Sequence, residues 1–170
     1  MQALSGTAKI LRPCGIRLKA TELKPLEAAA AFCDLPDGAA ARRPLLRELA
    51  RPLRLKNLQG LSLFVLPTPG QARYAFSVID ESAGAGCGSP RKPALLAEVG
   101  SVFITDFGLS ADPSYASLLL AHEIAHELTM KQHPTHAPRG SLLADHAAEM
   151  GPRIPDEDCA CMRQSPLLTP

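Results

Sequence analysis

The chain has 170 residues, of which 46% are hydrophobic and 21% charged, a composition typical of one globular domain with a sizeable core. Its 18 basic and 17 acidic residues give a formal net charge of +1, so neither nucleic acid nor an anionic membrane is an expected partner. No apolar run approaches the roughly 18 residues that cross a bilayer, and Met1–Ala8 does not have the features of a signal peptide.

Five cysteines bear on the cellular compartment without deciding it. Their odd number leaves at least one thiol free or paired between molecules. Buried thiols and the disulfides of an exported protein both fit this count, and a secreted or periplasmic location is the one favoured. Cys159 and Cys161 are separated by one residue, whereas the cysteines of a zinc-binding pair are typically roughly two to four residues apart.

The beginning of the chain predicts a helix, a short strand and a second helix. Leu4–Leu11 has apolar residues at helical spacing, and Pro13 ends that helix. Ile16–Ala20 alternates between apolar and polar residues and predicts a strand. Arg42–Leu55 combines leucines at helical spacing with arginines, which predicts an amphipathic helix with a solvated basic face, interrupted near Pro52.

The middle of the chain predicts three strands. Leu61–Leu66 is a continuous apolar run closed by a proline and predicts a buried strand. Tyr74–Ile79 and Val102–Thr105 predict two more. Ala83–Gly100 is rich in glycine and proline and predicts a long loop.

This order of elements predicts an α+β fold. We expect a mixed, twisted sheet with a backing helix and an active-site helix on one side, followed by a loop-rich C-terminal part that ends in a helix. We expect a single metallopeptidase-like domain over 1–170, with a sheet-containing part over 1–111 and the active-site helix and C-terminal part over 112–170. The sequence leaves the oligomeric state open, and a monomer is the expectation.

The chemistry is concentrated in the helix that follows the last strand. Asp112 is placed to cap this helix, with Pro113 in its first turn. One face is apolar and predicts contact with the core through Leu118, Ala121, Ala125 and Leu128.

His122 and His126 are four residues apart, so they project from the same side of the helix, one turn from each other. Two imidazoles in this arrangement can bind one Zn²⁺ at about 2.0–2.1 Å each. Glu123 lies beside the metal rather than in line with it, where it can take a proton from a metal-bound water. The alternative is a solvent-facing pair of histidines, but the flanking residues are too apolar for an exposed surface.

A catalytic zinc usually has three protein ligands and keeps its fourth position for water. His133 is the first candidate for the third ligand, because the chain turns after the helix and Pro134 prevents further helix. His136 is the second candidate. The remaining candidates lie further along the chain and are Asp145, His146 and Glu149.

The segment resembles the metzincin clan of zinc metallopeptidases, whose motif is His-Glu-x-x-His-x-x-Gly-x-x-His followed by a turn containing Met. His122, Glu123 and His126 match the first three functional positions. Thr129 stands in place of the glycine, and His133 lies one residue later than the third histidine of the clan.

The same resemblance extends to the C-terminal part. Gly140–Leu143 lies where related enzymes have the turn beneath the metal, with Leu143 in place of the methionine. Ile154–Arg163 resembles the C-terminal helix of such domains. The resemblance implies a zinc-dependent endopeptidase that acts on a peptide or protein substrate, with Glu123 as general base. An extended substrate is expected to pair with a sheet edge, formed by Tyr74–Ile79 or by Val102–Thr105.

Three alternatives remain open from the sequence. The first is a zinc peptidase in which Glu149, on a second helix, is the third ligand. The second is an inactive zinc-binding recognition module of the same fold, although such a module has no use for the carboxylate of Glu123. The third is a structural zinc site completed by Cys159 or Cys161, because structural sites fill all four positions with protein ligands.

Overall fold

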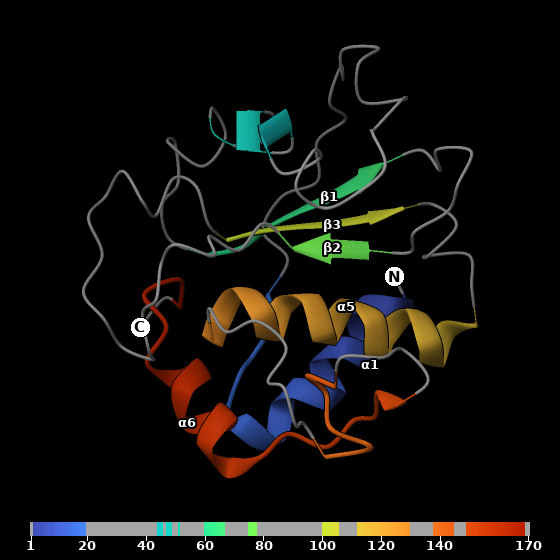
Figure 1. Ribbon diagram of the computed structural model, residues 1–170, viewed down its shortest axis with the longest axis vertical. Helices are drawn as coiled ribbons and strands as arrows, with labels where there is room; N and C mark the ends of the chain where they lie inside the picture. Colours follow the sequence, from blue (N-terminus) through green and yellow to red (C-terminus); the bar gives the residue numbers. More distant parts are fainter. Residues whose placement is uncertain are drawn as a thin grey trace.

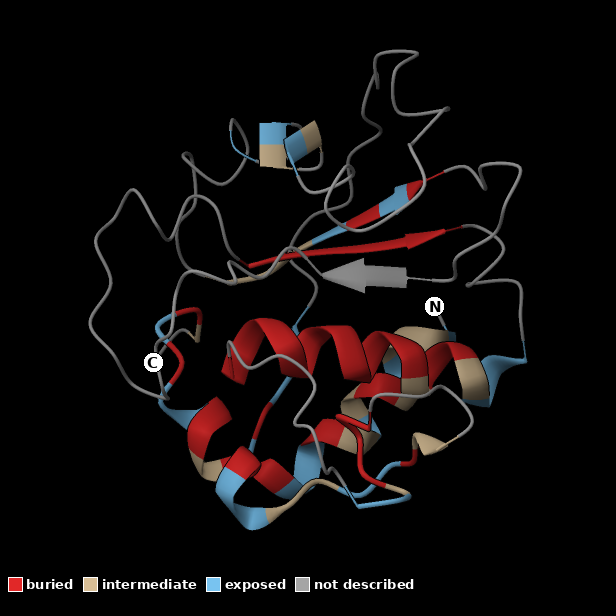
Figure 2. Ribbon diagram, viewed as in Figure 1, coloured by how far each residue is buried: buried red, intermediate tan, exposed pale blue. Residues whose placement is uncertain are grey.

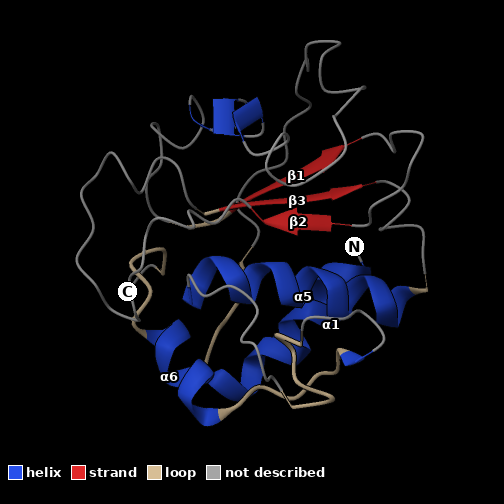
Figure 3. Ribbon diagram, in the orientation of Figure 1, coloured by secondary structure: helices blue, strands red, loops and turns tan. Residues whose placement is uncertain are grey.

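The protein has an α+β fold in which a three-stranded sheet lies against a layer of helices (Figure 1). The computed structural model describes residues 2–19, 44–45, 47–48, 51, 60–66, 75–77, 100–105, 112–129, 138–144 and 149–168. Figure 3 shows the helices and strands in different colours. In chain order the elements are α1 (Gln2–Leu11), the 3-10 turn η1 (Arg12–Cys14), β1 (Ser62–Leu66), β2 (Ala75–Ser77), β3 (Ser101–Thr105), α5 (Pro113–Thr129) and α6 (Asp156–Arg163).

The sheet is mixed, as its sequence pattern predicts. Its strand order is β1-β3-β2, with β1 parallel and β2 antiparallel to β3. All five residues of β3 are buried, as befits a central strand covered on both faces. Phe64 on β1 stacks against its register partner Phe103, with ring centroids 4.8 Å apart.

Two expectations about the strands are wrong. The run Leu61–Leu66 is not buried on both faces, because Leu63 and Val65 are 38% and 54% exposed while their neighbours point inward. The strand formed by Val102–Thr105 is not a sheet edge either, since it is paired on both sides. Among the described strands, β1 and β2 are the outer ones.

Helix α5 occupies the centre of the molecule (Figure 2). It packs against β2 and β3 on one side and against α1 and α6 on the other. Every residue from Leu119 to Thr129 is consequently buried. The sequence pattern predicted a single core face for this helix, and the structure instead surrounds its second half with neighbours.

The contact between α1 and α5 is close because a glycine faces a small side chain. A Cβ atom added at Gly6 would meet the Oγ of Ser117 and lie 2.6 Å from its Cβ. The hydroxyl of Thr7 donates hydrogen bonds to the carbonyl oxygens of Ala3 at 2.8 Å and Ser117 at 3.0 Å. The first helix of the chain is therefore fixed to the first half of α5, ahead of His122.

Ile16–Lys19 has no regular secondary structure, so the prediction of a strand over Ile16–Ala20 is wrong for the part that is described. Ile16 is buried and Arg17 exposed because the segment lies along the core, and this packing alone produces the alternating pattern. Of the helix expected over Arg42–Leu55, the residues at positions 44, 45, 47, 48 and 51 are helical. The rest of that range and the loop over 83–99 lie outside the described residues.

A disulfide joins Cys14, at the end of η1, to Cys159 in α6, across 145 residues of sequence. Cys161 is disulfide-bonded as well. Arg163 adds a hydrogen bond from its guanidinium to the carbonyl oxygen of Cys14 at 3.3 Å. A structural zinc site completed by Cys159 or Cys161 is therefore wrong, because a sulfur in a disulfide has no thiolate to offer a metal. Within the described ranges, no helix is both long and apolar enough to cross a bilayer.

Replacing both Cys14 and Cys159 by Ser should lower the free energy of unfolding by about 2–5 kcal/mol, because the unfolded chain regains the freedom of a very long loop. Urea unfolding followed by circular dichroism measures the change. Wild-type stability in the double variant would show that this disulfide contributes nothing to the folded state.

Candidate metal centre

Helix α5 begins at a side-chain cap. The Oδ1 of Asp112 accepts hydrogen bonds from the backbone N–H groups of Ser114 at 2.9 Å and Tyr115 at 3.2 Å. Pro113 is the first residue of the helix. The predicted start of the helix is thus confirmed.

The imidazoles of His122 and His126 face each other across one helical turn. Their Nε2 atoms are 3.0 Å apart, and the ring planes are nearly perpendicular, at 89°. The two residues are only 4% and 3% exposed, so they are not a solvent-facing pair. The 3.0 Å distance between the Nε2 atoms fits a hydrogen bond between the two rings, and it is also close to the separation of about 3.3 Å between two nitrogens bound to one tetrahedral zinc ion.

A backbone carbonyl group, that of Leu142, determines which ring nitrogen of His122 faces His126. The Nδ1 of His122 lies 2.5 Å from the carbonyl oxygen of Leu142. A carbonyl only accepts, so Nδ1 carries the proton and donates. In the neutral ring the lone pair is then on Nε2, which is the form that binds a metal.

Glu123 follows His122 directly and is 8% exposed. Successive residues of an α-helix are rotated by about 100°, so its carboxylate leaves the helix beside the line that joins the two histidines. This is the position expected of a base that acts next to a metal rather than as its ligand.

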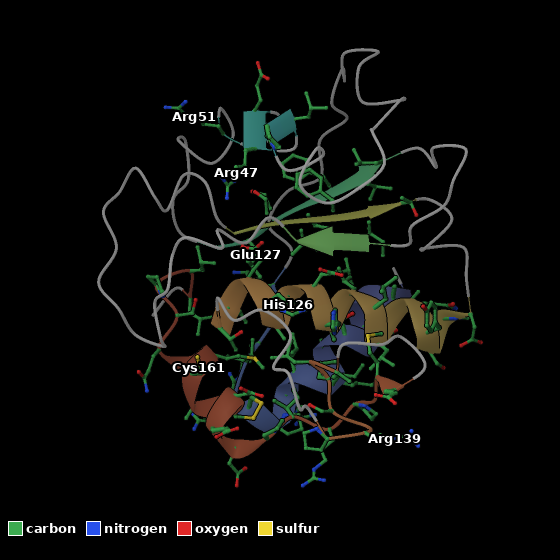
Figure 4. The ribbon with its side chains drawn as sticks, viewed as in Figure 1. Arg47, Arg51, His126, Glu127, Arg139 and Cys161 are labelled. Carbon is green, nitrogen blue, oxygen red and sulfur yellow. A yellow bond between two sulfur atoms is a disulfide. The ribbon has the colours of Figure 1, made fainter. Side chains whose placement is uncertain are left out.

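Glu127 is a second buried carboxylate of the same helix, and its side chain is directed toward the sheet (Figure 4). It is 1% exposed, and its Oε2 accepts a hydrogen bond of 2.6 Å from the N–H of Gly100. The carbonyl oxygen of Gly100 in turn accepts a bond of 2.8 Å from the N–H of Ser62. Glu127 therefore joins α5 to the start of β3 and, through Gly100, to β1.

The candidates for the third ligand fall almost entirely outside the described residues: His133, His136, Asp145 and His146. Glu149 is described, and its Oε1 lies 3.2 Å from the Nε of Arg139, which is on the surface (Figure 4). No three His, Cys, Asp or Glu side chains of the described ranges are grouped so as to hold a metal ion. Glu149 is thus not assembled with the two histidines.

The end of α5 departs from the pattern of the metzincin clan. The helix continues through Thr129, which is 1% exposed and donates a hydrogen bond from its hydroxyl to the carbonyl oxygen of Ala125 at 2.7 Å. The sulfur of Cys161 in α6 lies 3.6 Å from the carbonyl oxygen of Thr129. The position of the clan's glycine is therefore helical and packed in this chain.

Sequence patterns predict roles for His122, Glu123 and His126, but they do not point to Leu142 or Glu127. Every residue has a backbone carbonyl group, so no sequence pattern could predict that Leu142 accepts a hydrogen bond from His122. For Glu127 a signal exists: it is an acidic residue one turn after Glu123, and apolar residues such as Ile124 and Leu128 lie close to it in the sequence. The sequence matches no known protein-family model, and no curated protein is detectably similar to it.

Replacing Glu127 by Ala should lower the free energy of unfolding by about 1–3 kcal/mol, because the buried N–H of Gly100 loses its acceptor. Glu127→Gln keeps an acceptor oxygen and should cost less. Urea unfolding of the three proteins at one pH measures both effects. If Glu127→Ala is as stable as the wild type, the link between α5 and β3 has no energetic role.

Proposed function

We propose that this chain is a zinc-dependent metallopeptidase in which His122 and His126 bind the metal and Glu123 is the general base. The observation that carries the proposal is the convergence of two buried Nε2 atoms, 3.0 Å apart, on a helix that also carries an adjacent carboxylate. The imidazoles lie in the most buried part of α5, where polar side chains are costly unless they have partners, and a shared metal ion would be such a partner.

His133 is the third ligand in this proposal. It is four residues past the end of α5, and it lies one residue beyond the third histidine of the metzincin motif. When bound, zinc supplies Lewis-acid chemistry, polarising a carbonyl group and acidifying water. The bond from His122 to Leu142 supports His122 as a ligand, because ligating histidines commonly donate a hydrogen bond from their other nitrogen to a carbonyl or carboxylate.

Glu123 performs the proton transfers. As a base it takes a proton from the attacking water, and as an acid it delivers that proton to the nitrogen of the departing amine. The peptide C–N bond breaks, and the products are a carboxylic acid and an amine. The low exposure of Glu123 and both histidines keeps bulk water away from the carboxylate.

The substrate is a peptide or protein, bound in an extended conformation at an edge of the sheet. Strand β2 is the better edge, because it is an outer strand of the described sheet and also packs against α5. Main-chain hydrogen bonds along such an edge require little of the substrate's sequence. The disulfide between Cys14 and Cys159 supports a secreted or periplasmic enzyme, which we expect to act as a monomer.

An inactive zinc-binding recognition module is the second candidate. The observation that favours it is the packed, helical Thr129, which stands where the clan has the glycine that lets the chain turn toward the third ligand. Activity distinguishes the two candidates, whereas zinc content does not.

The purified chain should contain about one zinc ion, and His122→Ala and His126→Ala should both lose it. His133→Ala should weaken zinc binding far more than His136→Ala. Elemental analysis after dialysis measures the content.

Glu149→Ala is the matched control, since its carboxylate is engaged with Arg139. Full zinc content in both His122→Ala and His126→Ala would refute the proposed site, and a dominant loss in Glu149→Ala would favour the glutamate arrangement.

Glu123→Gln should retain fold and zinc but lose peptidase activity by about 10²–10⁴-fold, because the water loses its base. Cleavage of casein, with variants matched for zinc content, measures the loss. Equal cleavage by wild type and Glu123→Gln would show that α5 is not catalytic. Absence of cleavage by the wild type across a broad peptide library would favour the recognition module.

A further inference from the structure

We infer that Gly151 is a positioning residue for His122, acting through the carbonyl group of Leu142. The inference rests on the proposed function in treating His122 as a metal ligand. Its structural part, the placement of the proton of His122 by a distant backbone clamp, is independent of any metal.

The clamp consists of two segments, 140–142 and 149–153, that pair side by side. Four backbone hydrogen bonds join them, from Gly140 N to Glu149 O at 2.8 Å, Gly151 N to Ser141 O at 3.2 Å, Arg153 N to Gly140 O at 3.2 Å and Leu142 N to Arg153 O at 2.7 Å. Ser141 and Arg153 form a parallel bridge. The peptide groups on both sides of Ser141 are therefore held from the second segment.

Leu142 is thereby held at both of its polar backbone atoms. Its N–H is bonded to Arg153 and its carbonyl oxygen to His122. Leu142 and Leu143 are 0% and 1% exposed, so their side chains also fix the turn in the core. The clamp therefore fixes the peptide group that precedes Leu142, and the buried side chains of Leu142 and Leu143 restrict rotation of the carbonyl group that follows it.

Gly151 is the one position of the clamp where a side chain has no room. A Cβ atom there would lie 2.6 Å from the carbonyl oxygen of Gly140 and 2.8 Å from its Cα. Backbone atoms cannot move aside as a flexible side chain can, so any other residue separates the segments. The φ angle of Gly151 is not positive, so space rather than conformation requires the glycine.

Gly140 provides a contrast within the same clamp. Its φ is +79°, in the left-handed region, and nothing lies within 4 Å of a Cβ atom added there. Asn tolerates this region better than other residues with a side chain. The structure therefore has room for Gly140→Asn but not for Gly151→Ala, and Gly140→Asn is the matched control.

Long-range ¹H–¹⁵N correlation spectra of the metal-free, full-length protein report which nitrogen of His122 is protonated. We expect the proton on Nδ1 in the wild type and in Gly140→Asn. In Gly151→Ala we expect loss of this fixed Nδ1 proton and faster exchange of the Leu142 amide. Zinc should bind about 10- to 100-fold more weakly to Gly151→Ala, as is typical when a partner behind a ligand is lost, and within about threefold of wild type to Gly140→Asn.

A wild-type His122 protonated on Nε2, or a folded Gly151→Ala with unchanged zinc affinity, overturns the inference. If Gly151→Ala does not fold, the proton of the wild type decides alone, with Nδ1 supporting the inference and Nε2 overturning it. A wild type that binds no zinc, but whose Nδ1 proton is lost in Gly151→Ala, refutes the metal proposal and leaves the positioning role standing.

Discussion

The burial of α5 is the constraint on which the rest of the structure depends. Between Leu119 and Thr129 the helix carries two histidines and two glutamates, yet every residue of this stretch is buried. Buried polar groups are costly unless they have hydrogen-bond partners, so neighbouring segments must deliver them at fixed points. Gly100 does so for Glu127 at the start of β3, and Leu142 does so for His122. The sheet and the C-terminal turn are thus both anchored to one helix.

Local patterns predicted the elements but not their surroundings. The first helix, the three strands and α5 follow from apolar spacing, caps and prolines, because these act within a few residues, whereas the last helix was expected from the resemblance to the metzincin clan. The same information misjudged Ile16–Lys19, where contact with the core imitates strand alternation. It also misjudged β1, whose exposed face depends on what covers it, and α5, whose neighbours come from both ends of the chain.

In the candidate site, too, local relations were predictable from the sequence and contacts with distant parts of the chain were not. His122, Glu123 and His126 were predictable because one helical turn relates them, whatever the rest of the fold does. The disulfide partner of Cys159 was not, since any of four other cysteines was possible. Leu142 was beyond sequence reasoning because its contribution is a carbonyl oxygen common to all residues. Its place relative to His122 is determined by the 140–142 and 149–153 segments, whose pairing no motif announces.

The partners of α5 also set an order of events during synthesis. The two helices that pack against it are far apart in the sequence, α1 at Gln2–Leu11 and α6 at Asp156–Arg163. The disulfide of Cys14 can form only after Cys159 has been synthesised. As the chain emerges, α5 lacks α6 and the segment that holds Leu142 in place. The segment 149–153, which pairs with the residues around Leu142, must therefore leave the ribosome before His122 can acquire its final orientation. For a protein with the proposed hydrolytic chemistry, this delay keeps the nascent chain inactive while its own unfolded segments are exposed.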